Sequence, residues 1–176
     1  MSGEEVFPIY AQGFFVVCRG GLFHQILVFD YYDPGHYYMD LLSKPELFEG
    51  ELERLGLNMQ RYLDEEEIYI NGKPSKPQVE SVDVTFRGTP VRPSVVFTIT
   101  FRGKLHRGRN VYEEYYEAET LEYDYEAYWL FPPGVKVLEV KVDTKYEILE
   151  PGNRLIIWGG KGEKVSGYEM IAFKIP

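Results

Sequence analysis

The sequence is poor in cysteine, in long apolar runs and in positive charge. Its single cysteine, Cys18, excludes an internal disulfide and a metal site built from several thiolates. The longest apolar runs, 14–18 and 26–29, have the length of strands, whereas a helix that spans a bilayer needs roughly 20 residues. Residues 1–5 are acidic and lack both parts of a secretory signal, so we expect a cytoplasmic protein. A cell-surface domain separated from its anchor is the alternative.

The charge balance narrows the classes of partner. A net charge of −9 argues against broad binding of a phosphate backbone and favours a protein partner or a homo-oligomer over nucleic acid. The apolar share of 44% excludes a disordered chain, and 176 residues correspond to one domain, 1–176. The richness in Glu, Tyr, Val and Lys is typical of proteins from thermophilic organisms.

Most of the chain has the patterns of short strands joined by turns. Gly20-Gly21 and Asn71-Gly72 predict two-residue hairpin turns, and Pro74 and Pro77 predict that the strand after the second turn is short or at an edge. Within 82–101, apolar and polar residues alternate with the period of half-buried strands. We therefore predict a mainly β protein, an antiparallel β-sandwich, with a barrel as the second choice.

One short helical insertion is predicted around residues 43–63. Ser43 provides a capping hydroxyl, a proline follows in the first turn, and Glu46 stands where a capping box needs it. Gly56 predicts the end of the helix, and Asn58 predicts the cap of a shorter helical turn. The apolar residues on one face of the first helix are Phe48, Leu52 and Leu55.

Residues 112–131, YEEYYEAETLEYDYEAYWLF, mix aromatic and acidic side chains more densely than any other part of the chain. From 121 to 131 the two kinds alternate with a period of two, which predicts a strand with one apolar and one acidic face. A helix would bring Glu122 beside Glu126, like charge against like charge. We expect Tyr123, Tyr125 and Trp129 to be buried and Glu122, Asp124 and Glu126 to be exposed.

The five residues before this strand have no clear alternation and form our first candidate site. Exposed tyrosines and carboxylates could bind a glycan or a basic partner by stacking and hydrogen bonding. These residues are Tyr112, Glu113, Glu114, Tyr115 and Tyr116.

A second candidate site lies where a predicted strand gives way to a loop. Asp30, Asp33, His36 and Asp40 fall within eleven positions, and carboxylates with an imidazole can bind a divalent metal ion or supply an acid and a base. Asp33 is followed by Pro-Gly, so an ordinary turn capped by the aspartate is the alternative. No cofactor is predicted apart from this metal ion.

A third candidate is the basic segment 102–109, RGKLHRGR, at a predicted hairpin tip. Its four Lys and Arg residues contrast with the acidic remainder of the chain. Contact with nucleic acid is one interpretation, and a solvated loop is the other.

Residues 128–158, YWLFPPGVKVLEVKVDTKYEILEPGNRLIIW, form a pattern of strands and proline turns. This pattern resembles β-sandwich ectodomains of archaeal membrane proteins. The resemblance implies a β-sandwich and carries no functional motif, and the chain lacks the membrane helix adjacent to such ectodomains.

These observations favour a non-catalytic binding or protein-interaction domain. The alternatives are a small metal-dependent or acid/base hydrolase that uses the 30–40 loop, and a nucleic-acid adaptor that acts through segment 102–109. Metal content after purification would separate the first two hypotheses.

Overall fold

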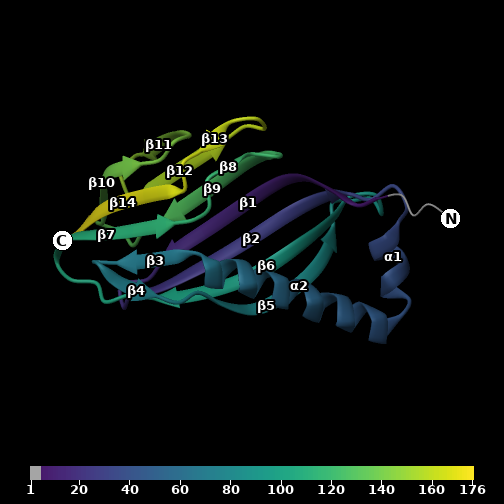
Figure 1. The fold of residues 1–176 in the computed structure, drawn as a ribbon. Coiled ribbons are helices and arrows are strands. Elements are labelled where there is room, and N and C mark those ends of the chain that lie inside the picture. The colour runs from purple at the N-terminus through teal and green to yellow at the C-terminus, as the bar shows by residue number, and fades with distance from the viewer. Residues whose placement is uncertain (1–4) are drawn as a thin grey trace.

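A seven-stranded sheet, called the large sheet below, is the main layer of the structure, a computed structural model that describes residues 5–176 (Figure 1). Its strand order is β11-β12-β9-β1-β2-β6-β5, and neighbouring strands are antiparallel except β1 and β9, which are parallel. The strands are β1 (Phe7–Val17), β2 (Leu22–Tyr32), β5 (Gln78–Phe86), β6 (Pro93–Arg102), β9 (Asp124–Leu130), β11 (Lys145–Leu149) and β12 (Arg154–Gly159).

A small sheet of five strands, in the order β10-β14-β7-β3-β4, forms a second layer, and a two-stranded ribbon pairs β8 with β13. The strands of the small sheet are β3 (Glu67–Ile70), β4 (Lys73–Ser75), β7 (Gly108–Tyr115), β10 (Lys136–Lys141) and β14 (Tyr168–Ile175). The ribbon strands are β8 (Glu119–Thr120) and β13 (Lys164–Val165). The two sheets are open and mainly antiparallel, so the predicted β-sandwich is confirmed.

The small sheet and the helices cover different parts of one face of the large sheet, which we call its inner face (Figure 1). Between the sheets, aromatic and aliphatic side chains such as Phe23, Tyr112 and Trp129 form the first core. Below the helices, a second core joins residues such as Leu63 to Phe97 and Ile99 of β6. A boundary between sheet-covered and helix-covered parts therefore crosses the inner face.

The helical insertion is confirmed, but its internal divisions were predicted wrongly. Helix α2 (Pro45–Glu65) is continuous, so Gly56 does not end it and Asn58 does not cap a second turn. A Cβ at position 56 would lie 3.2 Å from Cγ2 of Val82 on β5, which indicates that glycine allows close packing of α2 on the sheet. The N-cap is Lys44 without a side-chain cap, and Ser43 Oγ instead donates to the carbonyl of Asp40 at 2.7 Å.

Both predicted hairpins are present. Asn71-Gly72 is the predicted two-residue turn and joins β3 to β4, a three-residue edge strand that contains Pro74. The turn between β1 and β2 is longer than predicted, because it comprises residues 18–21 and only Gly21 of the glycine pair has a positive φ. Within residues 5–176, no helix has the length and apolar character needed to cross a membrane.

Segment 102–109 is not a hairpin tip. Strands β6 and β7 belong to different sheets, so this segment crosses from the large sheet to the small one. The buried Asn110 holds it in place, because its side chain accepts from the backbone N–H of His106 at 3.0 Å and donates to the carbonyls of His106 and Gly108. Hydrogen bonds of the Asn110 side chain thus stabilise the passage of this segment between the sheets, and the alternation of apolar and polar residues does not predict them.

Candidate functional site

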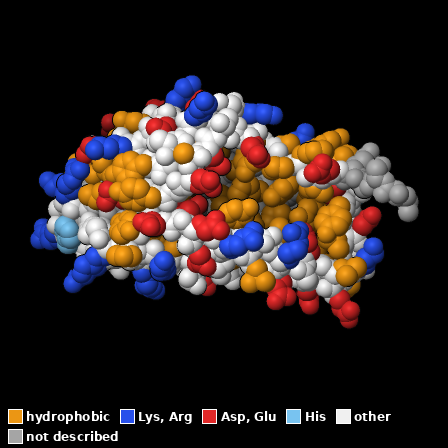
Figure 2. Space-filling view, viewed as in Figure 1, with side chains coloured by type: hydrophobic (Ala, Val, Ile, Leu, Met, Phe, Trp, Pro, Cys, Tyr) orange, Lys and Arg blue, Asp and Glu red, His pale blue; other side chains and the backbone are white. Residues whose placement is uncertain are grey.

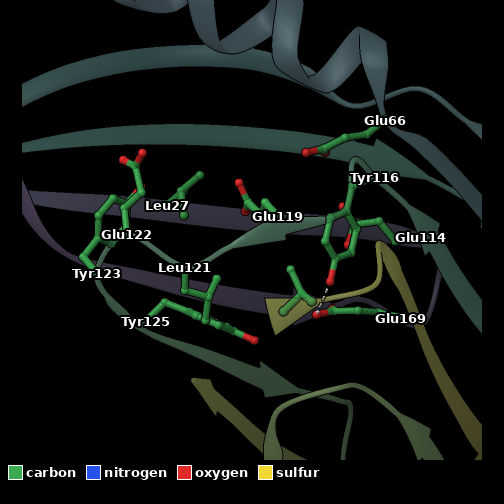
Figure 3. A pocket seen from close by; sticks show the side chains of 11 residues that line it. Leu27, Glu66, Glu114, Tyr116, Glu119, Leu121, Glu122, Tyr123, Tyr125 and Glu169 are labelled. Atoms are coloured by element: carbon green, nitrogen blue, oxygen red, sulfur yellow. Dashed lines mark hydrogen bonds between the residues drawn. The ribbon is translucent and has the colours of Figure 1, made fainter. Parts of the chain in front are cut away.

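A cavity of about 320 Å³ opens where the end of α2, the edge of the small sheet and the chain before β9 meet (Figure 3). It lies on the inner face of the large sheet, between the part covered by the small sheet and the part covered by the helices. We call it the glutamate cavity, because five of its lining residues are glutamates. The residues that line it are Leu27, Glu66, Glu114, Tyr116, Glu119, Leu121, Glu122, Tyr123, Tyr125, Val165 and Glu169.

Three of these glutamates, Glu66, Glu114 and Glu169, lie where α2 and the small sheet meet. Glu66 directly follows the last residue of α2, in extended backbone that leads into β3. Glu114 on β7 and Glu169 on β14 are register partners in the small sheet. Like charges directly opposite each other destabilise a strand pair, so this pairing favours at least one neutral carboxyl.

Hydrogen bonds fix the orientation of these carboxyl groups. The Tyr112 hydroxyl donates to Oε2 of Glu114 at 2.7 Å, and the Tyr116 hydroxyl lies 3.4 Å from Oε1 of Glu169 (Figure 3). Glu66 and Glu114 lie close enough for each carboxyl group to affect the pKa of the other. The three side chains therefore form one cluster of interacting carboxyl groups.

The environment of the cluster favours its protonated forms. Burial, together with the charges of Glu114 and Glu169, raises the pKa of Glu66 to about 8. Burial and the charge of Glu114 likewise raise the pKa of Glu169 to about 8. Burial raises the pKa of Glu114, although its hydrogen bonds with Tyr112 and Glu66 act in the opposite direction. The cluster thus changes its charge near neutral pH.

The other walls of the cavity are aromatic and aliphatic. Burial raises the pKa of both Tyr123 and Tyr125 to about 12, so their rings are neutral. The Tyr125 hydroxyl is hydrogen-bonded to Thr144 Oγ1 at 2.9 Å, and the Tyr123 ring lies edge-on to Phe29 at 6.4 Å. None of the eleven lining residues is Lys, Arg or His. Figure 2 shows hydrophobic and acidic side chains together between the helix and the strands.

The structure divides the predicted 112–116 site between two faces of the small sheet. Glu114 and Tyr116 line the glutamate cavity, and Tyr112 lies in the core with 1% exposure. Glu113 and Tyr115 lie on the opposite face, where the Tyr168 hydroxyl donates to Glu113 at 2.9 Å. Residues 112–115 are therefore the end of strand β7, with side chains that alternate between its two faces, and Tyr116 follows the strand.

Sequence reasoning missed most of the cavity, including Glu66 and Glu169. A signal for Glu169 was present, because it shares the strand face of Ile171 and Phe173, two residues with no exposure. A carboxyl on an apolar face of a strand is unusual and marks a buried titratable group. Glu66 carried no comparable signal.

The structure does not bring Asp30, Asp33, His36 and Asp40 into one site. Asp30 accepts from Ser94 Oγ and from Arg87 Nε, whereas the buried Asp33 accepts from two backbone N–H groups of α1 (Tyr37–Leu42). His36 precedes α1 and Asp40 is an exposed residue within it. Across residues 5–176, no group of three or more His, Cys, Asp or Glu side chains is arranged to hold a metal ion.

We expect the substitution Asp33→Ala to lower the free energy of unfolding by about 1–2 kcal/mol, the usual range for loss of a helix cap. The carboxylate accepts from the backbone N–H of Tyr37 and of Tyr38, each at 3.0 Å. Asp33→Asn retains an acceptor and should cost less. Urea unfolding of both variants measures the difference, and a harmless Asp33→Ala would contradict a capping role.

The basic segment leaves several charges available to solvent. Lys104, His106 and Arg107 are exposed, and Arg109 is paired with Glu139 of β10 at 2.8 Å. Figure 2 shows Lys and Arg side chains gathered near the end of the molecule where β3 and β4 lie. The segment lies at the opposite end of the small sheet's β7 from the glutamate cavity.

Comparison with known proteins adds little to this geometry. No protein-family model and no curated protein matches the chain. Among solved structures, the chain is similar to a protein from Parabacteroides distasonis ATCC 8503 described as a "putative protease", with a TM-score of 0.37 and 6% identity. The similarity covers 98% of this chain but 41% of that protein, and a TM-score this low carries no argument about fold or activity.

Proposed function

We propose that this protein is a non-catalytic binding domain that holds a small organic cation, an amine or a guanidinium, in the glutamate cavity. The observation that carries the proposal is the lining itself: five carboxyl groups and three tyrosines enclose about 320 Å³ without a cationic side chain. That volume is at the lower end of the range of small-molecule pockets. A ligand of a few heavy atoms therefore fits better than a polymer.

The electrostatics of the cavity favour a positive ligand. Glu114 and Glu169 are register partners, and the charge of Glu114 raises the pKa of Glu66, so deprotonation of the cluster places negative charges close together in a partly buried site. A cation within a few ångströms stabilises the charged form of a carboxyl group and offsets this repulsion. The rings of Tyr116, Tyr123 and Tyr125 can add cation–π attraction.

The apolar walls favour an organic cation over a metal ion. Leu27, Leu121 and Val165 offer no oxygen atoms, whereas hard divalent ions take six or more oxygen ligands. The methylene groups of an alkyl amine or alkyl guanidine would instead contact these side chains and leave water. The carboxyl groups would then bind the charged end.

Binding should be coupled to proton release. Because Glu66 and Glu169 have pKa values of about 8, they are largely protonated at pH 7, and a bound cation would lower both values. A guanidinium stays charged over this range, so the pH dependence reports on the protein. We expect agmatine to bind about tenfold more tightly at pH 8.5 than at pH 6.5. The release of one proton on binding changes the affinity about tenfold per pH unit, and this release is complete over only part of the interval.

Calorimetric titration with agmatine tests the proposal. Glu169→Gln removes a charge from the cavity and should weaken binding at pH 8.5 by at least about tenfold, or 1.4 kcal/mol. Glu113→Gln is the matched control, because Glu113 is the neighbour of Glu114 on β7 but lies on the other face. Equal losses in both variants would contradict the assignment to the cavity.

A neutral ligand gives the opposite result. Protonated carboxyl groups donate hydrogen bonds to sugar hydroxyls, so binding of a glycan would weaken as the pH rises. Saccharide binding with this pH dependence, together with no binding of agmatine or spermidine at millimolar concentration, would overturn the cation proposal.

A further inference from the structure

The outer face of the large sheet, opposite the helices and the small sheet, carries a continuous apolar patch. One row across four neighbouring strands contains Ile156, Tyr128, Phe14 and Ile26, which are successive register partners. The flanking rows add Leu130 and Val16 on one side, and Trp158, Val28 and Val96 on the other. We call these nine residues the apolar patch.

In the described part of the chain, five of the nine patch residues are exposed, three are half-buried and Val28 is buried. Phe14, Val16, Ile26, Leu130 and Trp158 are between 36% and 42% exposed. Within residues 5–176, neither core contains a residue of the patch, because both cores pack on the inner face. A half-buried antiparallel sheet usually presents polar residues to water, so an apolar outer face over four strands indicates an interaction surface.

We propose that this face binds a second copy of the chain, so that two large sheets stack in a symmetric dimer. Seven strands about 4.8 Å apart, each with a rise of about 3.4 Å per residue, give an outer face of about 30 by 30 Å. The whole face, with an area of about 900 Å², reaches the roughly 800 Å² per partner of a stable interface, and the apolar patch forms its centre while polar residues around the patch form its rim. Face-to-face packing of two sheets is an established arrangement with strands nearly aligned.

The charges around the patch select the orientation of the second copy. Arg154 and His24 lie in the row of Leu130 and Val16, at one end of the patch. Glu126 lies in the row of Trp158 and Gln12, and Asp124 lies one row further. Lys145 and Asp83 extend the row of Glu126 at its two sides, so this end of the patch is acidic on balance. A two-fold axis across the strands reverses their direction and places the basic end of one copy over the acidic end of the other.

This orientation makes specific contacts. With the axis on the row of Phe14, Arg154 lies over Trp158 of the second copy, between its Glu126 and its Lys145. The central aromatic pair, Phe14 and Tyr128, whose rings are 6.4 Å apart, packs on the same pair of the second copy. A two-fold axis along the strands would instead place the acidic end of one copy over the acidic end of the other, which repels.

Sedimentation velocity over 1–200 μM tests the proposal with three variants. Ile26→Lys should weaken the dimer at least tenfold without changing the far-UV circular dichroism, because residue 26 is 42% exposed and a lysine can reach water. Leu57→Lys is the control, since Leu57 is 66% exposed on α2, away from the patch. Arg154→Glu should also weaken the dimer, and addition of Glu126→Arg should restore it.

Three results would overturn the proposal. The first is a wild-type protein that stays monomeric at 200 μM, and the second is a dimer that Ile26→Lys leaves intact. The third is a monomer that binds lipid vesicles through the patch, which would assign this face to a membrane surface instead. A dimer that Ile26→Lys disrupts but the charge reversal does not restore would contradict the proposed orientation.

Discussion

Replacement of Trp129 by alanine should lower the free energy of unfolding by about 3–5 kcal/mol, the range for loss of a large aromatic side chain from a core. Trp129 on β9 is 2% exposed and stacks on Phe15 at a centroid distance of 4.1 Å. Its ring also contacts Tyr112 at 4.9 Å and Phe131 at 5.9 Å. The substitution therefore opens a cavity at the centre of the first core.

Guanidinium unfolding followed by far-UV circular dichroism measures this loss. Tyr62→Ala is the control, because Tyr62 is 57% exposed on α2 and its removal should change the free energy of unfolding by less than about 1 kcal/mol. A variant at position 129 as stable as the wild type would mean that the ring does not support the contact between the sheets. Comparable losses in both variants would indicate a general effect of aromatic truncation.

The burial of Trp129 was predictable because the strand alternation is local. From Tyr125 onward the odd positions face the core and the even positions face outward, as the period of two requires. The prediction was less accurate elsewhere in the stretch, since β9 begins at Asp124 and since Tyr125, expected to be buried, and Glu126, expected to be exposed, are both half-buried. Tyr123 therefore lies in the loop before the strand, where it lines the glutamate cavity. Strand boundaries depend on pairing with β1 and β12, which the sequence of 121–131 does not contain.

The length of α2 was not predictable from its own residues. A glycine after an apolar face usually ends a helix, and an asparagine two residues later usually begins another. Here Gly56 lies against Val82 of β5, so tertiary packing stabilises the helix through both positions. Local propensity is a weak guide where a sheet supports the backbone.

The glutamate cavity was hidden for a topological reason. Seven of its eleven lining residues come from 114–125, but the other four, Leu27, Glu66, Val165 and Glu169, come from distant parts of the sequence. Only the strand order of the small sheet makes Glu114 and Glu169 neighbours. The sequence alternation predicts that Glu114 lies on the same strand face as Tyr112 and Glu169 on the same strand face as Ile171. It does not predict that the two glutamates are neighbours, because this depends on the pairing of β7 with β14.

Stability should fall as the pH rises through the neutral range, because of this same cluster. Glu66 and Glu169 have pKa values of about 8 in the folded protein, against 4.5 for an ordinary glutamate. Below pH 4.5 both states hold these protons, and between 4.5 and 8 the unfolded chain releases them while the folded protein keeps them. The unfolded state is thus favoured increasingly with pH until about pH 8, after which the effect is constant.

Glu169→Gln should remove much of this dependence, because a neutral amide replaces the carboxyl group opposite Glu114. Without added cation, we expect the variant to exceed the wild type in stability at pH 8.5 by up to about 5 kcal/mol and at pH 5 by little, because the pKa of Glu169 is raised from 4.5 to about 8 and each unit corresponds to about 1.36 kcal/mol. Denaturant unfolding at the two pH values measures the difference, with Glu113→Gln as the control on the other face. A variant less stable than the wild type at pH 8.5 would mean that the charged form of Glu169 stabilises the folded protein. That result would contradict a raised pKa for the carboxyl groups of the cluster. A gain confined to high pH would instead place a repulsive carboxylate in an empty cavity, the charge that a bound cation would neutralise.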